Sequence, residues 1–237
     1  MKKNNTFFFS PSFYKGFIFP LLLWFIFFTP FSKNLDLNVS QYFYDRDHFQ
    51  IIPFWHFFFL YGFWPAWVLA FSALGGFILS YINSSYRSWR LPCIYLIMTF
   101  AVGSGLIVNV IFKDHWGRPR PRQVTEFGGQ EAFRPYYQPP SADRQNSLYH
   151  SFPSGHASTG FYFFSLAFLG AIYRSRLTYY SGLTLAWGLG ILLSLSRMIE
   201  GGHFLSDTLG AALIMWLTSW GLAYLFFSKR NGKEWKT

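Results

Sequence analysis

The chain has 237 residues, of which 51% are hydrophobic, 24% aromatic and only 13% charged. Soluble domains carry about a quarter charged residues, so this composition excludes an ordinary soluble protein and favours one membrane domain. The net charge of +10 does not indicate a nucleic-acid-binding protein, because the basic residues form short clusters between apolar runs rather than a continuous stripe. The single cysteine, Cys93, excludes an intrachain disulfide.

Six apolar runs predict membrane-spanning helices, since a helix needs about 20 residues to cross the hydrocarbon core. We expect spans at residues 16–31, 57–82, 91–112, 154–173, 177–195 and 203–227. Pro65 in the second run predicts a kink or an interfacial lead-in. The segments 32–56 and 113–153 are expected to be loops. The predicted fold is therefore all-α, with six transmembrane helices in a single domain over residues 1–237.

The distribution of charges predicts the orientation of these spans. If the N-terminus is inside, the inner segments hold the following basic residues: Lys2, Lys3, Lys15, Arg87, Arg90, Arg174, Arg176, Lys229, Arg230, Lys233 and Lys236. This pattern follows the positive-inside rule, so both termini are expected in the cytoplasm. The outer loop 113–153 is also basic, which is an exception to the rule. Cations at that depth are costly unless they meet an anion, so we expect an anionic substrate there.

Three short segments next to the outer ends of predicted spans carry the candidate chemistry. Their bounds are 113–121, 151–156 and 196–207. Lys113, Arg120 and Arg197 could surround a phosphoryl group with charge-assisted hydrogen bonds. Ser154 and Gly155 begin a predicted helix, where free backbone N–H groups favour an anion. The three segments together therefore indicate a phosphate-binding site on the outer face.

A candidate nucleophile lies at the start of the last predicted helix. His203 and Asp207 are four residues apart and so share one helix face. Asp207 could accept the proton on one ring nitrogen of His203, which would leave the other nitrogen free to attack phosphorus. Gly201 and Gly202 supply a turn that lets Arg197 approach His203. A zinc site is the alternative, but the nearby cations would repel the metal, so no metal or other cofactor is expected.

Each of these features has a simpler explanation when it is taken alone. The basic residues of the first segment could be anchors for lipid head groups, the Ser-Gly-His sequence could be a helix cap, and the histidine–aspartate pair could be a local helix contact. Their occurrence together on one membrane face favours a phosphate site instead. The remaining histidines lack such a setting and are expected to be structural, with a minor substrate contact left open for the last two: His48, His56, His115 and His150.

The three segments resemble the signature of the type 2 phosphatidic acid phosphatase family, which is Lys-x6-Arg-Pro, Pro-Ser-Gly-His and Ser-Arg-x5-His-x3-Asp. They match it at every position. The resemblance implies that His203 is the nucleophile, that Asp207 holds it, and that His156 protonates the leaving alkoxide and later activates water. It also implies a set of groups that bind the phosphoryl oxygens: Lys113, Arg120, Ser154, Gly155 and Arg197.

Residues 116–121, 127–129 and 133–135 are also similar to bacterial lipid A phosphatases that act at the 1- or 4′-position. Three further basic residues would suit a multiply phosphorylated head group as substrate contacts: Arg118, Arg122 and Arg134. We therefore expect a lipid phosphatase of the bacterial inner (cytoplasmic) membrane, with its active site facing the periplasm. The expected substrate is a phosphate monoester of lipid A or another membrane phospholipid. No nucleic acid and no obligate protein partner are expected.

Two alternatives remain open from the sequence. The enzyme could instead hydrolyse undecaprenyl pyrophosphate or phosphatidylglycerol phosphate. A protein of a different class, which binds phospholipid without catalysis, would need the cations but not the nucleophile, so the presence of His156, His203 and Asp207 argues against it. Vanadium haloperoxidases share the same phosphate-site residues, but they are soluble, and the six predicted spans disfavour that resemblance.

Overall fold

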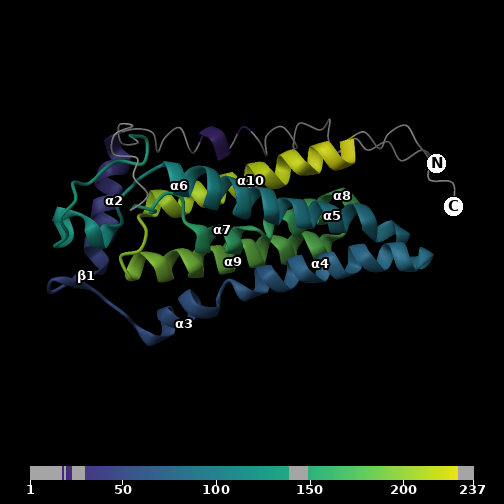
Figure 1. Cartoon of the computed structure of the whole chain (residues 1–237), viewed down its shortest axis with the longest axis horizontal. Coiled ribbons are helices and arrows are strands. Elements are labelled where there is room, and N and C mark those ends of the chain that lie inside the picture. Colours follow the sequence, from purple (N-terminus) through teal and green to yellow (C-terminus); the bar gives the residue numbers. More distant parts are fainter. Residues whose placement is uncertain (1–17, 19, 23–29, 139–148, 229–237) are drawn as a thin grey trace.

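In the computed structural model, residues 18, 20–22, 30–138 and 149–228 are described. Long helices lie side by side in an elongated bundle (Figure 1). In chain order the elements are α2 (Pro30–Phe43), β1 (Tyr44–Asp45), β2 (His48–Phe49), α3 (Pro53–Tyr61), α4 (Trp64–Ile82), η2 (Ser84–Trp89), α5 (Arg90–Thr99), η3 (Phe100–Phe112), α6 (Lys113–His115), η4 (Pro121–Gln123), η5 (Thr125–Phe127), α7 (Gly155–Phe161), α8 (Phe164–Tyr173), α9 (Arg176–Ile199) and α10 (Leu205–Phe227).

Four helical stretches in the described part of the chain are long and apolar enough to cross a membrane. They are Pro53–Ile82, Ser84–Phe112, Arg176–Ile199 and Leu205–Phe227, and they correspond to four of the six predicted spans. The predicted span 154–173 forms α7 and α8, which are separated at Tyr162 and Phe163, so neither helix alone has the required length. The predicted span 16–31 lies almost entirely outside the described residues.

The expectation that 32–56 is a loop was wrong. This segment contains most of α2 and an antiparallel hairpin in which Tyr44 pairs with Phe49. The buried residues of α2 are Ser32, Asp36 and Ser40, which recur every four residues and so lie on one helix face. Because this buried face is polar, α2 lacks the apolar periodicity by which a helix is recognised in a sequence.

The helices of the bundle approach closely where they carry small residues. A Cβ atom on Gly160 of α7 would lie only 2.6 Å from the Cα atom of Gly190 on α9. Buried hydroxyl groups add hydrogen bonds between helices, as when Tyr95 Oη donates to the carbonyl oxygen of Ser219 at 3.0 Å. In a membrane, where lipid tails are as apolar as side chains, such close packing and polar contacts hold helices together.

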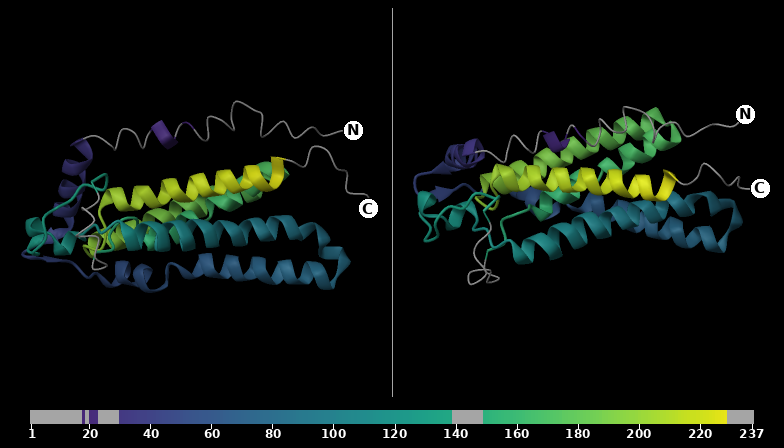
Figure 2. Two further views of the ribbon diagram at one scale, coloured as in Figure 1. Left: turned by 45° about the horizontal axis from the view of Figure 1, so that its top comes forward. Right: turned by 90° about the horizontal axis from the view of Figure 1, so that it is seen from above.

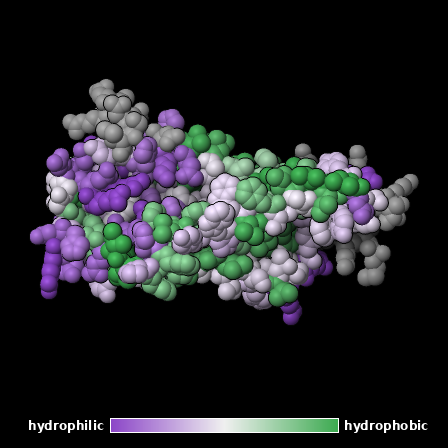
Figure 3. Space-filling model, turned by 60° about the horizontal axis from the view of Figure 1, so that its bottom comes forward, coloured by the Kyte–Doolittle hydropathy of each residue, from purple (hydrophilic) through white to green (hydrophobic). Residues whose placement is uncertain are grey.

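The bundle has two different ends. The turns that join α4 to α5 and α8 to α9 lie at one end, and the segment from α6 to η5 and the α9–α10 connection lie at the other (Figure 2). Hydrophilic residues gather at the second end, while hydrophobic residues cover much of the bundle on the face shown in Figure 3. Four basic residues lie in or next to the two turns of the first end: Arg87, Arg90, Arg174 and Arg176. They are far from the basic residues of the three candidate segments, which lie at the second end.

Candidate active site

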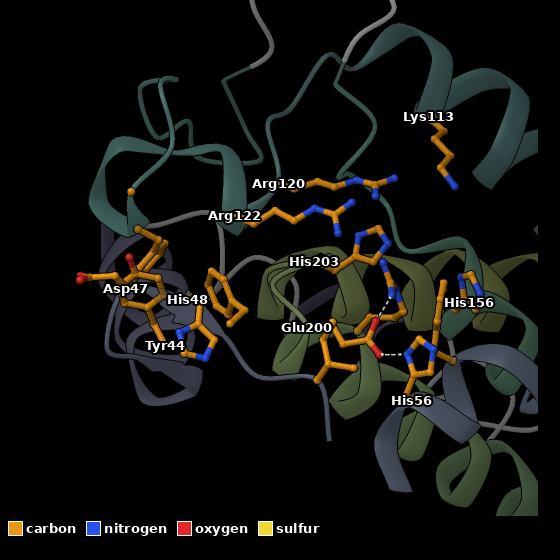
Figure 4. A pocket seen from close by; sticks show the side chains of 16 residues that line it. Tyr44, Asp47, His48, His56, Lys113, Arg120, Arg122, His156, Glu200 and His203 are labelled. Atoms are coloured by element: carbon orange, nitrogen blue, oxygen red, sulfur yellow. Dashed lines mark hydrogen bonds and ion pairs between the residues drawn. The ribbon is translucent and has the colours of Figure 1, made fainter. Parts of the chain in front are cut away.

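A cavity of about 690 Å³ lies at the hydrophilic end of the bundle. All three candidate segments contribute side chains to it, and Figure 4 shows these side chains converging from different elements. The cationic and imidazole groups that line it include Lys113, Arg120, Arg122, His156, Arg197 and His203. The lining also includes aromatic residues of the β1–β2 hairpin, of α3 and of η5. The structure thus brings together groups of the three candidate segments that are up to 90 residues apart in the sequence, from Lys113 to His203.

Lys113 stands where η3 ends and α6 begins. Its Nζ atom donates a hydrogen bond to Asn109 Oδ1 at 3.4 Å. A Cβ atom on Gly155 would lie 3.3 Å from Lys113 Nζ and 2.8 Å from Asn109 Oδ1, so the lysine amine is next to the start of α7. The sequence analysis did not include Asn109, although its spacing of four residues from Lys113 in a helix was a usable signal.

Arg120 and Arg122 extend side by side into the cavity (Figure 4). Burial lowers the pKa of Arg120, and the positive charge of Arg122 lowers it further, while Asp207 acts in the opposite direction. The backbone N–H of Arg122 donates to the carbonyl oxygen of Gly201 at 3.2 Å, which ties the first segment to the third. Two neighbouring guanidinium groups in a partly buried site favour binding of an anion.

Arg118 does not line this cavity, and its role as a substrate contact stays a prediction. Its side chain is only 1% exposed. It forms ion pairs with both Asp36, at 2.8 Å, and Asp207, and its Nε atom donates to the carbonyl oxygen of Arg134 at 2.9 Å. Arg134 is likewise outside the cavity lining. The reason is Asp36, which comes from the unpredicted helix α2 and supplies a counter-charge that draws Arg118 inward.

In the second segment only His156 reaches the cavity. Ser154 is the N-cap of α7, where its hydroxyl oxygen accepts a hydrogen bond from the Ala157 N–H at 3.4 Å. Ser154 and Gly155 are buried and do not line the cavity, so phosphate contacts by these two residues remain predictions. The His156 ring lies 5.1 Å from the ring of Phe59, measured between centroids, which places it against α3.

The two glycines before His203 shape the third segment as predicted. Gly201 has a φ of +62°, a left-handed conformation that side chains rarely adopt. A Cβ atom on Gly202 would lie 2.2 Å from an Nη atom of Arg197. Only a glycine therefore lets the Arg197 guanidinium pack directly against the backbone, next to His203.

The Nδ1 atom of His203 has a different nearest partner from the one predicted. It lies 2.6 Å from the carbonyl oxygen of Ser151 and 3.6 Å from Asp207 Oδ2. A carbonyl oxygen only accepts hydrogen bonds, so Nδ1 must carry the proton and Nε2 holds the lone pair. His203 precedes α10, and burial lowers its pKa to about 4, with Asp207 opposing the shift and Arg197 adding to it. The ring is therefore neutral at pH 7, as a nucleophile requires.

Asp207 is fully buried and holds the surrounding backbone in place. Its Oδ2 atom accepts hydrogen bonds from Ser151 Oγ at 2.6 Å and from the Phe204 N–H at 2.8 Å. Asp207 thus fixes Ser151, and the carbonyl group of Ser151 fixes His203. The sequence analysis assigned Ser151 no role, because a contact made by a backbone carbonyl group leaves no signal in residue types.

Two lining residues were also missed. Glu200, directly after α9, forms an ion pair with Arg197 at 2.7 Å, and its Oε1 atom lies 2.9 Å from His56 Nδ1. The predicted span ended at residue 195, before Arg197, so the spacing of three residues between Arg197 and Glu200 would have been a signal only if this helix had been extended. The second pair joins residues 144 positions apart, and nothing in the sequence indicates it. His56, which was expected to be structural, therefore lines the cavity.

Comparison with known proteins supports the family resemblance of the three segments, which all lie within the matched region. The family model of the PAP2 superfamily (type 2 phosphatidic acid phosphatases) matches residues 94–231. A lipid A 4′-phosphatase of Francisella tularensis subsp. novicida is 32% identical over 87% of this chain and 92% of its own length. A lipid A 4′-phosphatase of Rhizobium leguminosarum is 37% identical over 51% of this chain and 47% of its own length.

A lipid A 1-phosphatase of Rhizobium johnstonii is 30% identical over 56% of this chain and 47% of its own length. No solved structure gives a significant match. The match to the family model covers more than half of the chain, and the Francisella relative aligns with most of it. The chain belongs to the PAP2 superfamily.

Proposed function

We propose that this protein is a membrane lipid phosphatase that removes a phosphate monoester from lipid A, with the 4′-phosphate favoured over the 1-phosphate. The observation that carries the proposal is the convergence of Lys113, Arg120, Arg197, His156 and His203 on one cavity at the polar end of a helical bundle. Membership of the PAP2 superfamily and the names of the relatives support the activity and the substrate. The preference for the 4′-position follows the relative that aligns with most of the chain.

The cations of the cavity would bind the phosphoryl group. Lys113, Arg120 and Arg197 donate to its oxygens, whose negative charge is redistributed as the transition state forms. The donors come from three elements that are fixed to each other by buried contacts, so they need little reorganisation during the reaction. The backbone N–H groups at the start of α7, which lies next to the Lys113 amine, would add to the positive potential.

The reaction would proceed in two steps through a phosphohistidine. In the first, the Nε2 lone pair of His203 attacks phosphorus, the bond from phosphorus to the lipid oxygen breaks, and His156 donates a proton to that oxygen. In the second, His156 takes a proton from water, the water oxygen attacks phosphorus, and the P–N bond breaks to release phosphate. The Ser151 carbonyl group and Asp207 stabilise the positive charge on the His203 ring between the two steps.

The membrane topology that fits this reaction has six spans, with both termini in the cytoplasm and the cavity facing the periplasm. The helices α7 and α8 together supply one span, because only Tyr162 and Phe163 separate them. The basic turns at the opposite end of the bundle then lie in the cytoplasm, in agreement with the positive-inside rule. The site would meet lipids of the outer leaflet of the inner membrane.

Thiol labelling tests this orientation. In a Cys93→Ser background, Glu126→Cys is expected to react with a membrane-impermeant maleimide in spheroplasts, because Glu126 is exposed at the cavity end. Ser85→Cys, which is exposed in the turn between α4 and α5, is expected to react only after lysis. The reverse pattern would show that the cavity faces the cytoplasm.

The substrate is tested with purified protein in detergent. We expect phosphate release from bisphosphorylated lipid A with a kcat/KM at least about tenfold above that for undecaprenyl pyrophosphate or phosphatidylglycerol phosphate, a difference of about 1.4 kcal/mol in transition-state binding. Mass spectrometry of the product should show a lipid A that has lost its 4′-phosphate and kept its 1-phosphate. Rapid hydrolysis of the other two lipids without hydrolysis of lipid A would refute the proposed substrate.

A further inference from the structure

Glu200 is an acidic residue in a cavity that is otherwise lined mainly by cations and histidines. It directly follows Ile199, the last residue of α9, and its side chain is only 9% exposed. Both carboxylate oxygens are used. Oε2 accepts from an Nη atom of Arg197 at 2.7 Å, and Oε1 lies 2.9 Å from His56 Nδ1. Figure 4 shows the Glu200 carboxylate directed toward the ring of His56.

Arg197 is held on three sides. Glu200 binds one end of its guanidinium group, the backbone of Gly202 packs against another Nη atom, and the ring of Phe59 lies 4.3 Å from the guanidinium carbon. Its Nε atom is buried and has no hydrogen-bond partner among the described residues. These contacts fix the orientation of Arg197 before any anion binds. The anion therefore does not have to immobilise a mobile arginine side chain, which would cost about 2 kcal/mol of rotamer entropy.

The presence of the Glu200 carboxylate in a phosphate-binding cavity requires an explanation, because a negative charge near the cavity repels a phosphate group. The two hydrogen bonds of Glu200 direct its charge toward Arg197 and His56 and away from the space between the cations. His56 and Phe59 are three residues apart on α3, hence on one face of this helix. His56 contacts Glu200, and the ring of Phe59 contacts Arg197. The helix α3 therefore forms a wall that supports Arg197 from outside the three motif segments.

We propose that Glu200 is a positioning residue for this site: its carboxylate orients the phosphate-binding guanidinium of Arg197, and His56 on α3 orients the carboxylate. This inference rests on the proposed phosphate site, but it does not depend on which lipid carries the phosphate. A purely structural ion pair at the end of α9 would stabilise the fold without any specific effect on binding of an anion at Arg197.

Binding of orthovanadate, which mimics a phosphoryl group, tests the inference without a choice of lipid. Glu200→Gln keeps the shape of the side chain but removes its charge. We expect it to weaken vanadate binding and to lower kcat/KM by about 10- to 100-fold, as for loss of a charge-assisted hydrogen bond. In an Arg197→Ala background the same substitution should change vanadate binding by less than about twofold, because the residue that it orients is absent.

The matched control is Glu126→Gln. Glu126 is an exposed acid outside the cavity lining, and its substitution removes the same charge at a distance from Arg197, so we expect a change below about twofold. A second variant, His56→Ala, leaves the Arg197–Glu200 contact in place and should weaken binding by about 3- to 10-fold, with no further loss in the Glu200→Gln background. Thermal unfolding of each variant in detergent separates folding defects from binding defects.

The outcomes are distinct. Equal effects of Glu200→Gln with and without Arg197, or unchanged vanadate affinity, would overturn the positioning role alone. If the wild-type protein does not bind vanadate, the proposed phosphate site fails, and the positioning role fails with it.

Discussion

His203→Ala is expected to lower the rate of lipid dephosphorylation by about 10³-fold or more, because it removes the atom proposed to form the covalent intermediate. His203 is 2% exposed and makes its side-chain hydrogen bond to the Ser151 carbonyl oxygen, so its loss should leave a small cavity rather than an unpaired charge. Folded protein should therefore remain in the membrane. Release of phosphate from lipid A by equal amounts of wild-type and variant protein measures the effect.

A suitable control for this experiment is His115→Ala. His115 is exposed, and among the described residues its ring bonds only to the backbone carbonyl groups of Val110 and Ile111 in η3, so we expect less than about a twofold change in activity. Samples that have reacted with lipid A carrying radiolabelled phosphate and are quenched with alkaline detergent should show label on the wild-type protein that base preserves and acid removes. Substantial turnover by His203→Ala would exclude the phosphohistidine. An unchanged lipid profile in cells that carry the variant would favour a protein that binds phospholipid without catalysis.

Arg118→Ala is expected to have the second large effect, on stability. The substitution leaves Asp36 and Asp207 buried and close together without the cation that neutralises them. Removal of one partner from a buried ion pair typically costs about 3–5 kcal/mol. Thermal unfolding in detergent and the yield of folded protein measure this loss, and activity should fall with it because Asp207 holds Ser151.

Two further variants make this prediction specific. Arg134→Ala keeps the backbone carbonyl group that Arg118 uses, so we expect a change in stability below about 0.5 kcal/mol. Asp36→Asn combined with Arg118→Ala should be less destabilised than Arg118→Ala alone, because one of the two uncompensated charges is gone. If Arg118→Ala instead unfolds like the wild-type protein and only raises KM, Arg118 contacts substrate after all.

The groups that line the cavity could be predicted from the sequence where the signal is local. Lys113 with Arg120, and His203 with Arg197, lie within short segments whose spacing is set by one or two helical turns and a tight turn. Long apolar runs likewise predicted the helices, because a span requires a minimum length. The break between α7 and α8 was not predicted, since Tyr162 and Phe163 are apolar and continue the run without a proline or glycine.

The missed contacts are those in which a distant residue or a backbone atom supplies the partner. Asp36 pairs with Arg118 across 82 positions, and His56 pairs with Glu200 across 144, distances at which spacing carries no information. The carbonyl group of Ser151 is present in every residue type, so no sequence pattern marks it. The buried position of Arg118 was missed for the same reason, because a cation near a phosphate motif was assigned to the substrate when its counter-charges were unknown.

The polar helix α2 means that the site draws on two separate parts of the chain. The PAP2 match begins at residue 94, yet Asp36, well before it, accepts hydrogen bonds from Ser206 at the start of α10 as well as from Arg118. The region that carries all the motif residues therefore does not contain Asp36, one of the two carboxylates that neutralise its buried Arg118. Relatives that share only this region must neutralise a buried arginine at this position in another way, or do without it.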